Sequence, residues 1–322
     1  MERVLTTPAR SPKARLPQSQ AGLGVLLGLT AYGLWGLFPL YFALVAEVGP
    51  IEVVANRVLW SLVFLVILTT VTRSWARTLA AARSPRRVSL LALAAAFLAV
   101  NWGTYVYAVA SNQVVEASLG YFLNPLVSVA LGVIFLRERL RTIQWVAVGL
   151  AVVAVGVLAV SYGRLPWISL VLAVSFGVYG LLKKQADVGA VPSLTIETAA
   201  LAPFAAIALG WFLAHGTSAY ETHGISMAVL LALLGPVTAV PLLAFGGAAI
   251  RIPLSTLGLV QYVTPVLQFL LGVFVFGEAM PPLRWAGFAI VWACLVLVTF
   301  DGIRQARAGR PQALAEELIE PD

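Results

Sequence analysis

Long apolar stretches separated by short polar segments make up most of the chain between residues 22 and 300. A helix of about 20 apolar residues is long enough to cross the hydrocarbon core of a bilayer. The pattern therefore predicts an all-α polytopic membrane protein with ten transmembrane helices. The sixth and tenth stretches are short, so nine spans is the alternative count. The expected spans cover residues 22–44, 51–72, 88–110, 115–136, 143–161, 166–182, 194–214, 225–247, 254–276 and 285–300.

The composition agrees with a membrane environment. Apolar residues make up 60% of the 322-residue chain and charged residues 11%, with a mean hydropathy of +0.92. Soluble proteins have about 45–50% apolar and about 25% charged residues, so a soluble enzyme or nucleic-acid-binding protein is disfavoured. The net charge of +7 does not change this, because the basic residues are spread between the apolar stretches. We expect the lipid bilayer as a partner and no nucleic acid.

The distribution of arginine and lysine predicts the orientation, because basic loops stay on the cytoplasmic side of a membrane. With ten spans, all but three of the 21 basic residues fall on the side of the amino-terminal tail, the exceptions being Arg57, Arg164 and Arg284. We therefore expect a multi-pass protein of the inner (plasma) membrane with both termini in the cytoplasm. Residues 1–20 form an expected disordered basic tail, and residues 303–322 a second cytoplasmic tail.

The chain also repeats itself at a shift of 140 residues. Pro125 then aligns with Pro265, and Trp145 aligns with Trp285. Chance matching in an apolar sequence is the alternative explanation, but the ungapped register favours a duplication.

A duplication divides the chain into two repeats, over residues 21–162 and 163–302, with five spans in each. Because five is an odd number, the second repeat crosses the membrane inverted relative to the first. Inverted repeats around a central site are typical of transporters that work by alternating access.

Four ionisable residues fall inside the expected spans, where charges are expensive and often functional. Arg57 lies about seven residues into the second span, roughly 10 Å deep, and would face another helix, a cavity, or a carboxylate such as Glu116. It is either a packing or snorkelling arginine or a clamp for an anion or carbonyl. Glu52, Glu116 and Glu197 lie near the starts of spans. They would either complement the positive helix terminus or act in coupling or gating.

Amide and aromatic side chains near two prolines are candidates for a substrate site. Proline removes one backbone hydrogen bond from a membrane helix and frees a carbonyl group. Pro125 and Pro265 should therefore bend the fourth and ninth spans at matching depth and take part in gating. Interhelical hydrogen bonds by Asn and Gln, and an interfacial belt for Trp35, are the alternatives. With Arg57, the expected substrate-binding residues are Trp35, Asn101, Trp102, Tyr121, Asn124, Gln261 and Tyr262.

The sequence lacks the motifs that several other functions require. There is no phosphate-binding loop for ATP hydrolysis. The two histidines, His215 and His223, lie outside the spans, and with the single Cys294 they are too few for an ordinary structural zinc site. We therefore expect no metal, no cofactor and no enzymatic activity.

Three runs of the sequence are distinctive: residues 115–122 (VEASLGYF), 124–126 (NPL) and 138–140 (ERL). They resemble the RarD-type permeases, the chloramphenicol-sensitive protein family in the EamA branch of the drug/metabolite transporter superfamily. The resemblance covers about residues 22–302. It implies ten helices in two EamA repeats, an inner-membrane location, and export or exchange of a small solute. Family members often carry His where this chain has Asn56, so the resemblance assigns no proton-coupling role to that position.

The leading hypothesis is a secondary transporter that moves a small metabolite or drug by alternating access. A passive channel or facilitator and a non-transporting membrane subunit are the alternatives. With no histidine inside a span, proton coupling would have to use Glu52, Glu116 or Glu197. A homodimer is an alternative to a monomer, and the sequence does not identify the substrate.

Overall fold

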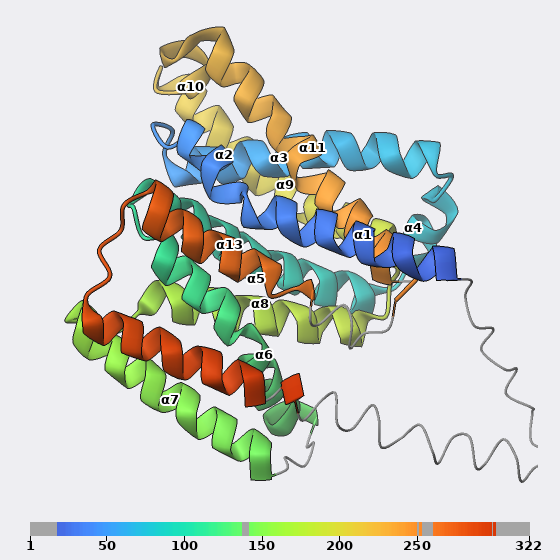
Figure 1. Cartoon of the computed structure of the whole chain (residues 1–322). Helices are drawn as coiled ribbons and strands as arrows, with labels where there is room; N and C mark the ends of the chain where they lie inside the picture. Colours follow the sequence, from blue (N-terminus) through green and yellow to red (C-terminus); the bar gives the residue numbers. More distant parts are fainter. Residues whose placement is uncertain (1–17, 137–141, 250, 253–259, 298, 301–322) are drawn as a thin grey trace, which may run out of the picture.

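The structure is a computed structural model that describes residues 18–136, 142–249, 251–252, 260–297 and 299–300. All regular secondary structure in these residues is helical (Figure 1). In chain order the helices are α1 (Gln18–Gly36), α2 (Phe38–Leu44), α3 (Pro50–Val71), α4 (Trp75–Ala82), α5 (Pro85–Ala110), α6 (Val114–Leu136), α7 (Thr142–Tyr162), α8 (Trp167–Ala186), α9 (Ala190–Ala214), α10 (Ala219–Thr222), α11 (Gly224–Ala249), α13 (Val263–Leu270), the π-helix η1 (Leu271–Val275) and a helix over Pro282–Leu297.

Prolines, a serine and glycines mark several helix ends. α3 begins at Pro50, whose missing N–H is not needed in the first turn of a helix. Ser84 caps α5, because its side chain accepts a hydrogen bond from the backbone N–H of Arg87 at 3.4 Å. Gly163 and Gly216 follow α7 and α9 with φ angles of 66° and 65°, a conformation that glycine adopts without steric strain.

Each of the ten expected stretches overlaps a helix, and the chain is a polytopic membrane protein. Among the described residues, six helices are long and apolar enough to cross a membrane. Four shorter apolar helices accompany them. The six long candidates are Gly22–Leu44, Pro50–Val71, Pro85–Ala110, Trp145–Tyr162, Ala190–Ala214 and Gly224–Phe245.

The structure differs from the expected spans in some details. The first stretch is divided into α1 and α2 around Leu37, because Pro39 has no N–H to continue the helical hydrogen bonds. The hydropathy pattern does not predict the short helices α4 and α10. Residues 18–20, expected in the amino-terminal tail, form the first turn of α1. The rest of both tails, and residues 254–259 of the ninth stretch, lie outside the described residues.

The long helices lie side by side in one bundle (Figure 1). α4 and the beginning of α1 lie at one end of the bundle, which we call the α4 end. α2 and α10 lie at the opposite end, the α10 end. α3 packs against α9 and α11, α5 packs against α8, and α6 packs against α8 and α13. α1 packs against α11 and α13.

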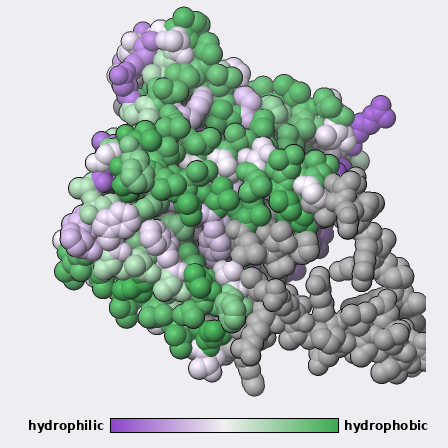
Figure 2. Space-filling model, viewed as in Figure 1, coloured by the Kyte–Doolittle hydropathy of each residue, from purple (hydrophilic) through white to green (hydrophobic). Residues whose placement is uncertain are grey.

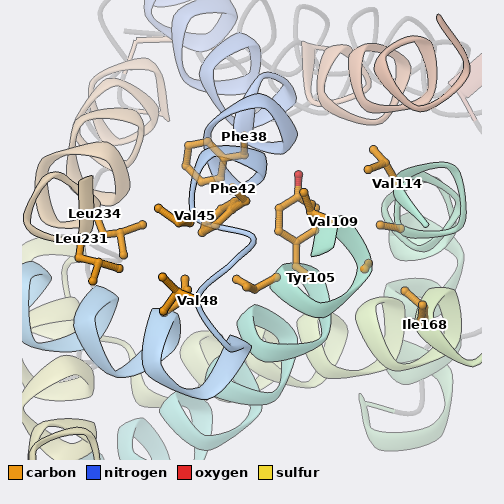
Figure 3. Close-up of a cluster of buried hydrophobic side chains, with 14 of the residues drawn as sticks. Phe38, Phe42, Val45, Val48, Tyr105, Val109, Val114, Ile168, Leu231 and Leu234 are labelled. Carbon is orange, nitrogen blue, oxygen red and sulfur yellow. The ribbon is translucent and has the colours of Figure 1, made fainter. Parts of the chain in front are cut away.

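Apolar side chains occupy both the inside and the outside of the bundle. One buried cluster joins α2, α3, α5 and α11 around Phe42, Tyr105 and Leu231 (Figure 3). Outside, Phe204, Ile207 and Trp211 are exposed along α9, and apolar residues cover most of the face seen in Figure 2. An apolar exterior of this extent matches a surrounding of lipid chains, where water-facing helices would carry polar residues.

Candidate functional site

A cavity of about 650 Å³ enters the bundle from the α4 end. Its mouth includes the exposed residues Arg77, Arg87 and Asp187. Hydroxyl-bearing residues and one indole lie at its inner part. The lining residues are Ser61, Leu65, Leu68 and Thr72 of α3 and the turn after it, Ser74, Arg77, Ala80 and Ala81 at α4, Arg87 and Trp102 of α5, Asp187–Pro192, Leu194 and Thr198 at α9, and Thr238, Ala239, Leu242, Leu243 and Gly247 of α11.

The cavity follows α3 for about half of that helix. The lining positions run from Thr72, just after α3, back to Ser61, which is about 16 Å at 1.5 Å per residue. Its size and its mixture of apolar walls with a few polar groups are typical of sites for small organic molecules.

Arg57 lies directly behind the inner wall of this cavity. Its side chain is buried, at 4% exposure. Nε donates a hydrogen bond to Oγ1 of Thr238 at 3.0 Å, and the guanidinium carbon lies 4.0 Å from the centroid of the Trp102 ring. Thr238 and Trp102 both line the cavity. The guanidinium group is therefore held in place by two residues that themselves form part of the cavity wall.

Of the three environments considered for Arg57, the structure does not show the pairing with Glu116. Glu116 accepts from Arg164 at 2.7 Å and from the backbone N–H of Ile168 at 3.1 Å, which places its carboxylate at the start of α8. Among the described residues, none of the acidic side chains forms an ion pair with Arg57.

A series of ring contacts connects Arg57 to Tyr121. The Arg57 guanidinium carbon lies 5.5 Å from the Phe42 ring. Phe42 contacts Tyr105 at 5.7 Å between ring centroids, and Tyr105 contacts Tyr121 at 5.8 Å. Tyr121 thus belongs to the surroundings of Arg57, although it does not line the cavity.

Asn101 forms a contact between two helices. Its amide nitrogen donates to the carbonyl of Leu172 and to Oγ of Ser175, both at 3.0 Å. The side chain is buried between α5 and α8 and does not line the cavity. Its geometry matches the interhelical hydrogen bonding that was the alternative for this residue.

The other expected binding residues lie away from the cavity. Trp35 packs against the rings of Tyr32 and Phe245, at 5.3 and 5.9 Å between ring centroids. Tyr262 packs against the buried cluster of α6, α7 and the helix over 282–297. Asn124 and Gln261 are not among the cavity residues either.

The two expected gating prolines occupy different places in their helices. Pro125 lies in the interior of α6, whereas Pro265 lies in the first turn of α13. A bend at matching depth stays a prediction.

Glu52 and Glu197 each have several hydrogen-bonding partners. Glu52 accepts from Oγ of Ser218 and from the backbone N–H of Ala219, both at 2.8 Å. Glu197 accepts from Lys183 Nζ at 3.1 Å and from the hydroxyl of Tyr179 at 3.2 Å. It lies two turns into α9, because this helix starts at Ala190, earlier than the hydropathy pattern indicates.

One face of α3 binds the segment that contains α10, at the α10 end of the bundle. Glu52, Asn56 and Trp60 are four residues apart and therefore share a face of the helix. Glu52 binds the start of α10, and the hydroxyl of Tyr220 donates to Asn56 and accepts from Trp60. We call residues 216–224 the strap. The four-residue spacing in the sequence indicates that the three side chains share a face, but it does not indicate what this face binds.

Thr238, Ser61 and Thr198 are cavity residues that the sequence analysis does not select. Hydroxyl side chains are common in membrane helices, and the spacing of these three in the sequence does not distinguish them from the other serines and threonines. A further signal for Thr238 is that the run Thr238-Ala239 is one of those that resemble the RarD-type family.

Glu278 lies in the irregular segment between η1 and the helix over 282–297. Its carboxylate accepts from the backbone N–H groups of Val114 and Val115 at the start of α6. Burial raises the pKa of Glu278 to about 7, although these N–H groups and Arg284 act in the opposite direction.

Several known proteins are similar to this chain in sequence or in fold. Residues 22–160 match the EamA-like transporter family. The chain is 52% identical to Protein RarD of Streptomyces exfoliatus, over 94% of this chain and 99% of that protein. It is 41% identical to an uncharacterized transporter of Vibrio cholerae, over 91% and 97% of the two chains. A crystal structure of a protein that is 20% identical has the same fold, with a TM-score of 0.57 over 88% of this chain and 98% of the other.

Proposed function

Because the chain belongs to the RarD proteins of the EamA-like transporter family, we propose that it is a secondary transporter that moves a small metabolite or drug by alternating access, through export or exchange. The observation that carries this proposal is a cavity that is open at the α4 end and stops near the middle of α3, beside a buried arginine. A cavity of this kind gives a solute access from one side at a time.

The packing of the helices supports ten spans in two inverted repeats, over 21–162 and 163–302. The duplication relates α1 to α8, α3 to α9, α5 to α11 and α6 to α13. α5 packs against α8, and correspondingly α11 packs against α1. α6 packs against α8 as α13 packs against α1, while α3–α9 and α6–α13 pair each helix with its own counterpart. Two related halves can exchange conformations, which opens the site alternately to the two sides.

In the proposed orientation the α4 end faces the cytoplasm. The segment that contains α4 and the first turn of α5 carries five arginines, Arg73, Arg77, Arg83, Arg86 and Arg87. The beginning of α1 lies at the same end, and the helix over 282–297 runs toward it (Figure 1). The cavity would then be open to the cytoplasm, and the strap would close the outer side of the inner membrane. A homodimer stays a prediction.

If transport is coupled to protons, Glu197 is the best placed of the three carboxylates. Its neighbour Thr198 lines the cavity, and Lys183 is its ion-pair partner. Glu197→Gln should then abolish uptake driven by a pH gradient in liposomes and leave exchange without a gradient. Glu47→Gln is the control, because Glu47 is exposed and lies outside the cavity, with His223 at 3.7 Å as its neighbour. Unchanged coupling in Glu197→Gln would exclude this residue.

The proposed function is tested with the purified full-length protein in liposomes. A transporter should give uptake that saturates with solute concentration, and a solute loaded inside should accelerate uptake of the labelled solute. Flux that rises linearly with concentration would favour a passive facilitator. No flux of any metabolite or drug in a broad screen would favour a membrane subunit without transport activity.

A further inference from the structure

We propose that the transported solute is an organic anion, and that its carboxylate binds to the two terminal amino groups of Arg57, immediately behind the inner wall of the cavity. This inference rests on the proposed transport function and names the substrate class for the same site. It follows from the partners of Arg57, from its geometry, and from the charges along the cavity.

The first argument concerns charge. A buried cation is normally paired, because removing a charge from water without a partner is strongly unfavourable. The buried carboxylates of this chain follow the same rule, since Glu116 pairs with Arg164 and Glu197 pairs with Lys183. Arg57 is also buried and has no acidic partner among the described residues. An exchangeable anion from the cytoplasm would neutralise it.

The second argument concerns geometry. Arginine has five N–H groups in a planar fork that matches a carboxylate with two parallel hydrogen bonds. Thr238 uses the Nε group, and the guanidinium carbon lies over the Trp102 ring, 4.0 Å from its centroid. In the described part of the chain, no acceptor forms a hydrogen bond with either terminal amino group. Thr238 and Trp102 thus hold the guanidinium group, and its two terminal amino groups are not used by acceptors of the described residues.

The third argument concerns the path to the site. Arg77 and Arg87 line the mouth together with one acidic residue, Asp187. A cleft with an excess of positive charge raises the local concentration of anions. The walls between mouth and inner end are mainly apolar, including Leu65, Leu68, Ala239 and Leu242. This combination suits a carboxylate with an apolar body better than a small inorganic ion.

The test compares two probes of the same shape, 3-phenylpropionate and its neutral amide, by calorimetry on the purified full-length protein at pH 7. We expect the carboxylate to bind at least about tenfold more tightly, because hydrogen bonds to charged groups are stronger than neutral ones. Arg57→Gln should remove this preference. Arg57→Lys should keep a smaller preference, since it retains the charge without the fork. Phenyl phosphate, a third probe, tells whether the site selects carboxylates over phosphate esters.

Matched variants separate the site from general charge effects. Arg87→Gln removes a charge from the cavity mouth and should weaken binding of 3-phenylpropionate in low salt. Arg86→Gln removes the neighbouring charge, which does not line the cavity, and should change binding less. If Arg57→Gln does not fold, Thr238→Val, which removes the Nε partner and keeps the charge, should reduce the preference several-fold.

Equal affinity for the carboxylate and the amide, or binding of neither probe, would overturn the anion proposal. Saturable transport of neutral solutes without a preference for anions would overturn it too, and would leave the transport function standing. Binding of 3-phenylpropionate that depends on Arg57, in a protein that gives no flux in liposomes, would support the anion site and overturn the proposed function.

Discussion

At the scale of single residues, the buried charges of this protein divide into two kinds. Glu52 and Glu116 accept hydrogen bonds from the starts of neighbouring helices, where a carboxylate complements unpaired N–H groups. Each of the two carboxylates has at least two hydrogen-bond donors in the observed state. Arg57 has a single hydrogen bond and an aromatic neighbour, Trp102. The side chain with the fewest partners is the one best placed to bind a solute.

Glu278 makes stability depend on pH. Its pKa is raised to about 7, above the ordinary value of 4.5, so the folded protein holds a proton that the unfolded chain releases between these pH values. The free energy of unfolding should therefore decrease as the pH rises from about 4.5 to about 7. Thermal unfolding in detergent should show the wild type losing stability relative to Glu278→Gln over this range. Parallel pH profiles for the two proteins would contradict the prediction.

At the scale of elements, the contact between α3 and α11 positions the inner end of the cavity. Gly235 of α11 lies against the backbone of α3, and a Cβ atom there would lie 2.5 Å from the carbonyl oxygen of Trp60. Only glycine allows this approach, which places Thr238, one turn further along α11, beside Arg57.

Gly235→Ala should push α11 away from α3. We expect a loss of about 1–3 kcal/mol in the free energy of unfolding, as for overpacking in a protein core, together with weaker solute binding. Gly149→Ala on α7 is the matched control, because nothing beyond the adjoining backbone of its own helix lies within 4 Å of the added Cβ. It should leave stability unchanged or raise it by up to about 1 kcal/mol, because alanine favours a helix more than glycine does. Equal thermal unfolding temperatures for the two variants would contradict this account.

At the scale of the whole molecule, the cavity opens at the α4 end, and the strap is bound to α3 at the α10 end. We propose an equilibrium between this state and one that is open at the α10 end. Tyr220→Phe removes two hydrogen bonds between the strap and α3. At about 1 kcal/mol each, their loss would shift the equilibrium toward the second state by up to about thirtyfold.

Cysteine labelling measures this shift. With Cys294→Ser as background, Leu242→Cys places a single thiol in the cavity wall. A membrane-impermeant maleimide should label it faster from the cytoplasmic side than from outside, and Tyr220→Phe should raise labelling from outside. Tyr107→Phe, at an exposed site on α5, is the control and should have no effect. Faster labelling from outside in the unmodified background would contradict the proposed orientation.

Much of the architecture could be predicted from the sequence because the bilayer imposes a simple rule along the chain. Spans must be long and apolar, and basic loops must stay on one side. The helices and the membrane location follow from this rule, and the same rule singles out Arg57 as a charge inside an expected span. The runs of residues that resemble the RarD family predicted the family, and the comparisons confirmed it.

Only the tertiary structure decided which side chains meet. It paired Glu116 with Arg164 instead of Arg57, placed Asn101 between α5 and α8, and brought Thr238 of α11 to Arg57. The physical reason is that lipid, and not water, surrounds the helices. A membrane helix is apolar on nearly all sides, so its sequence shows no apolar stripe that would reveal which face turns inward. The rotation of each helix, and with it the composition of the cavity, is determined by packing between segments far apart in the chain.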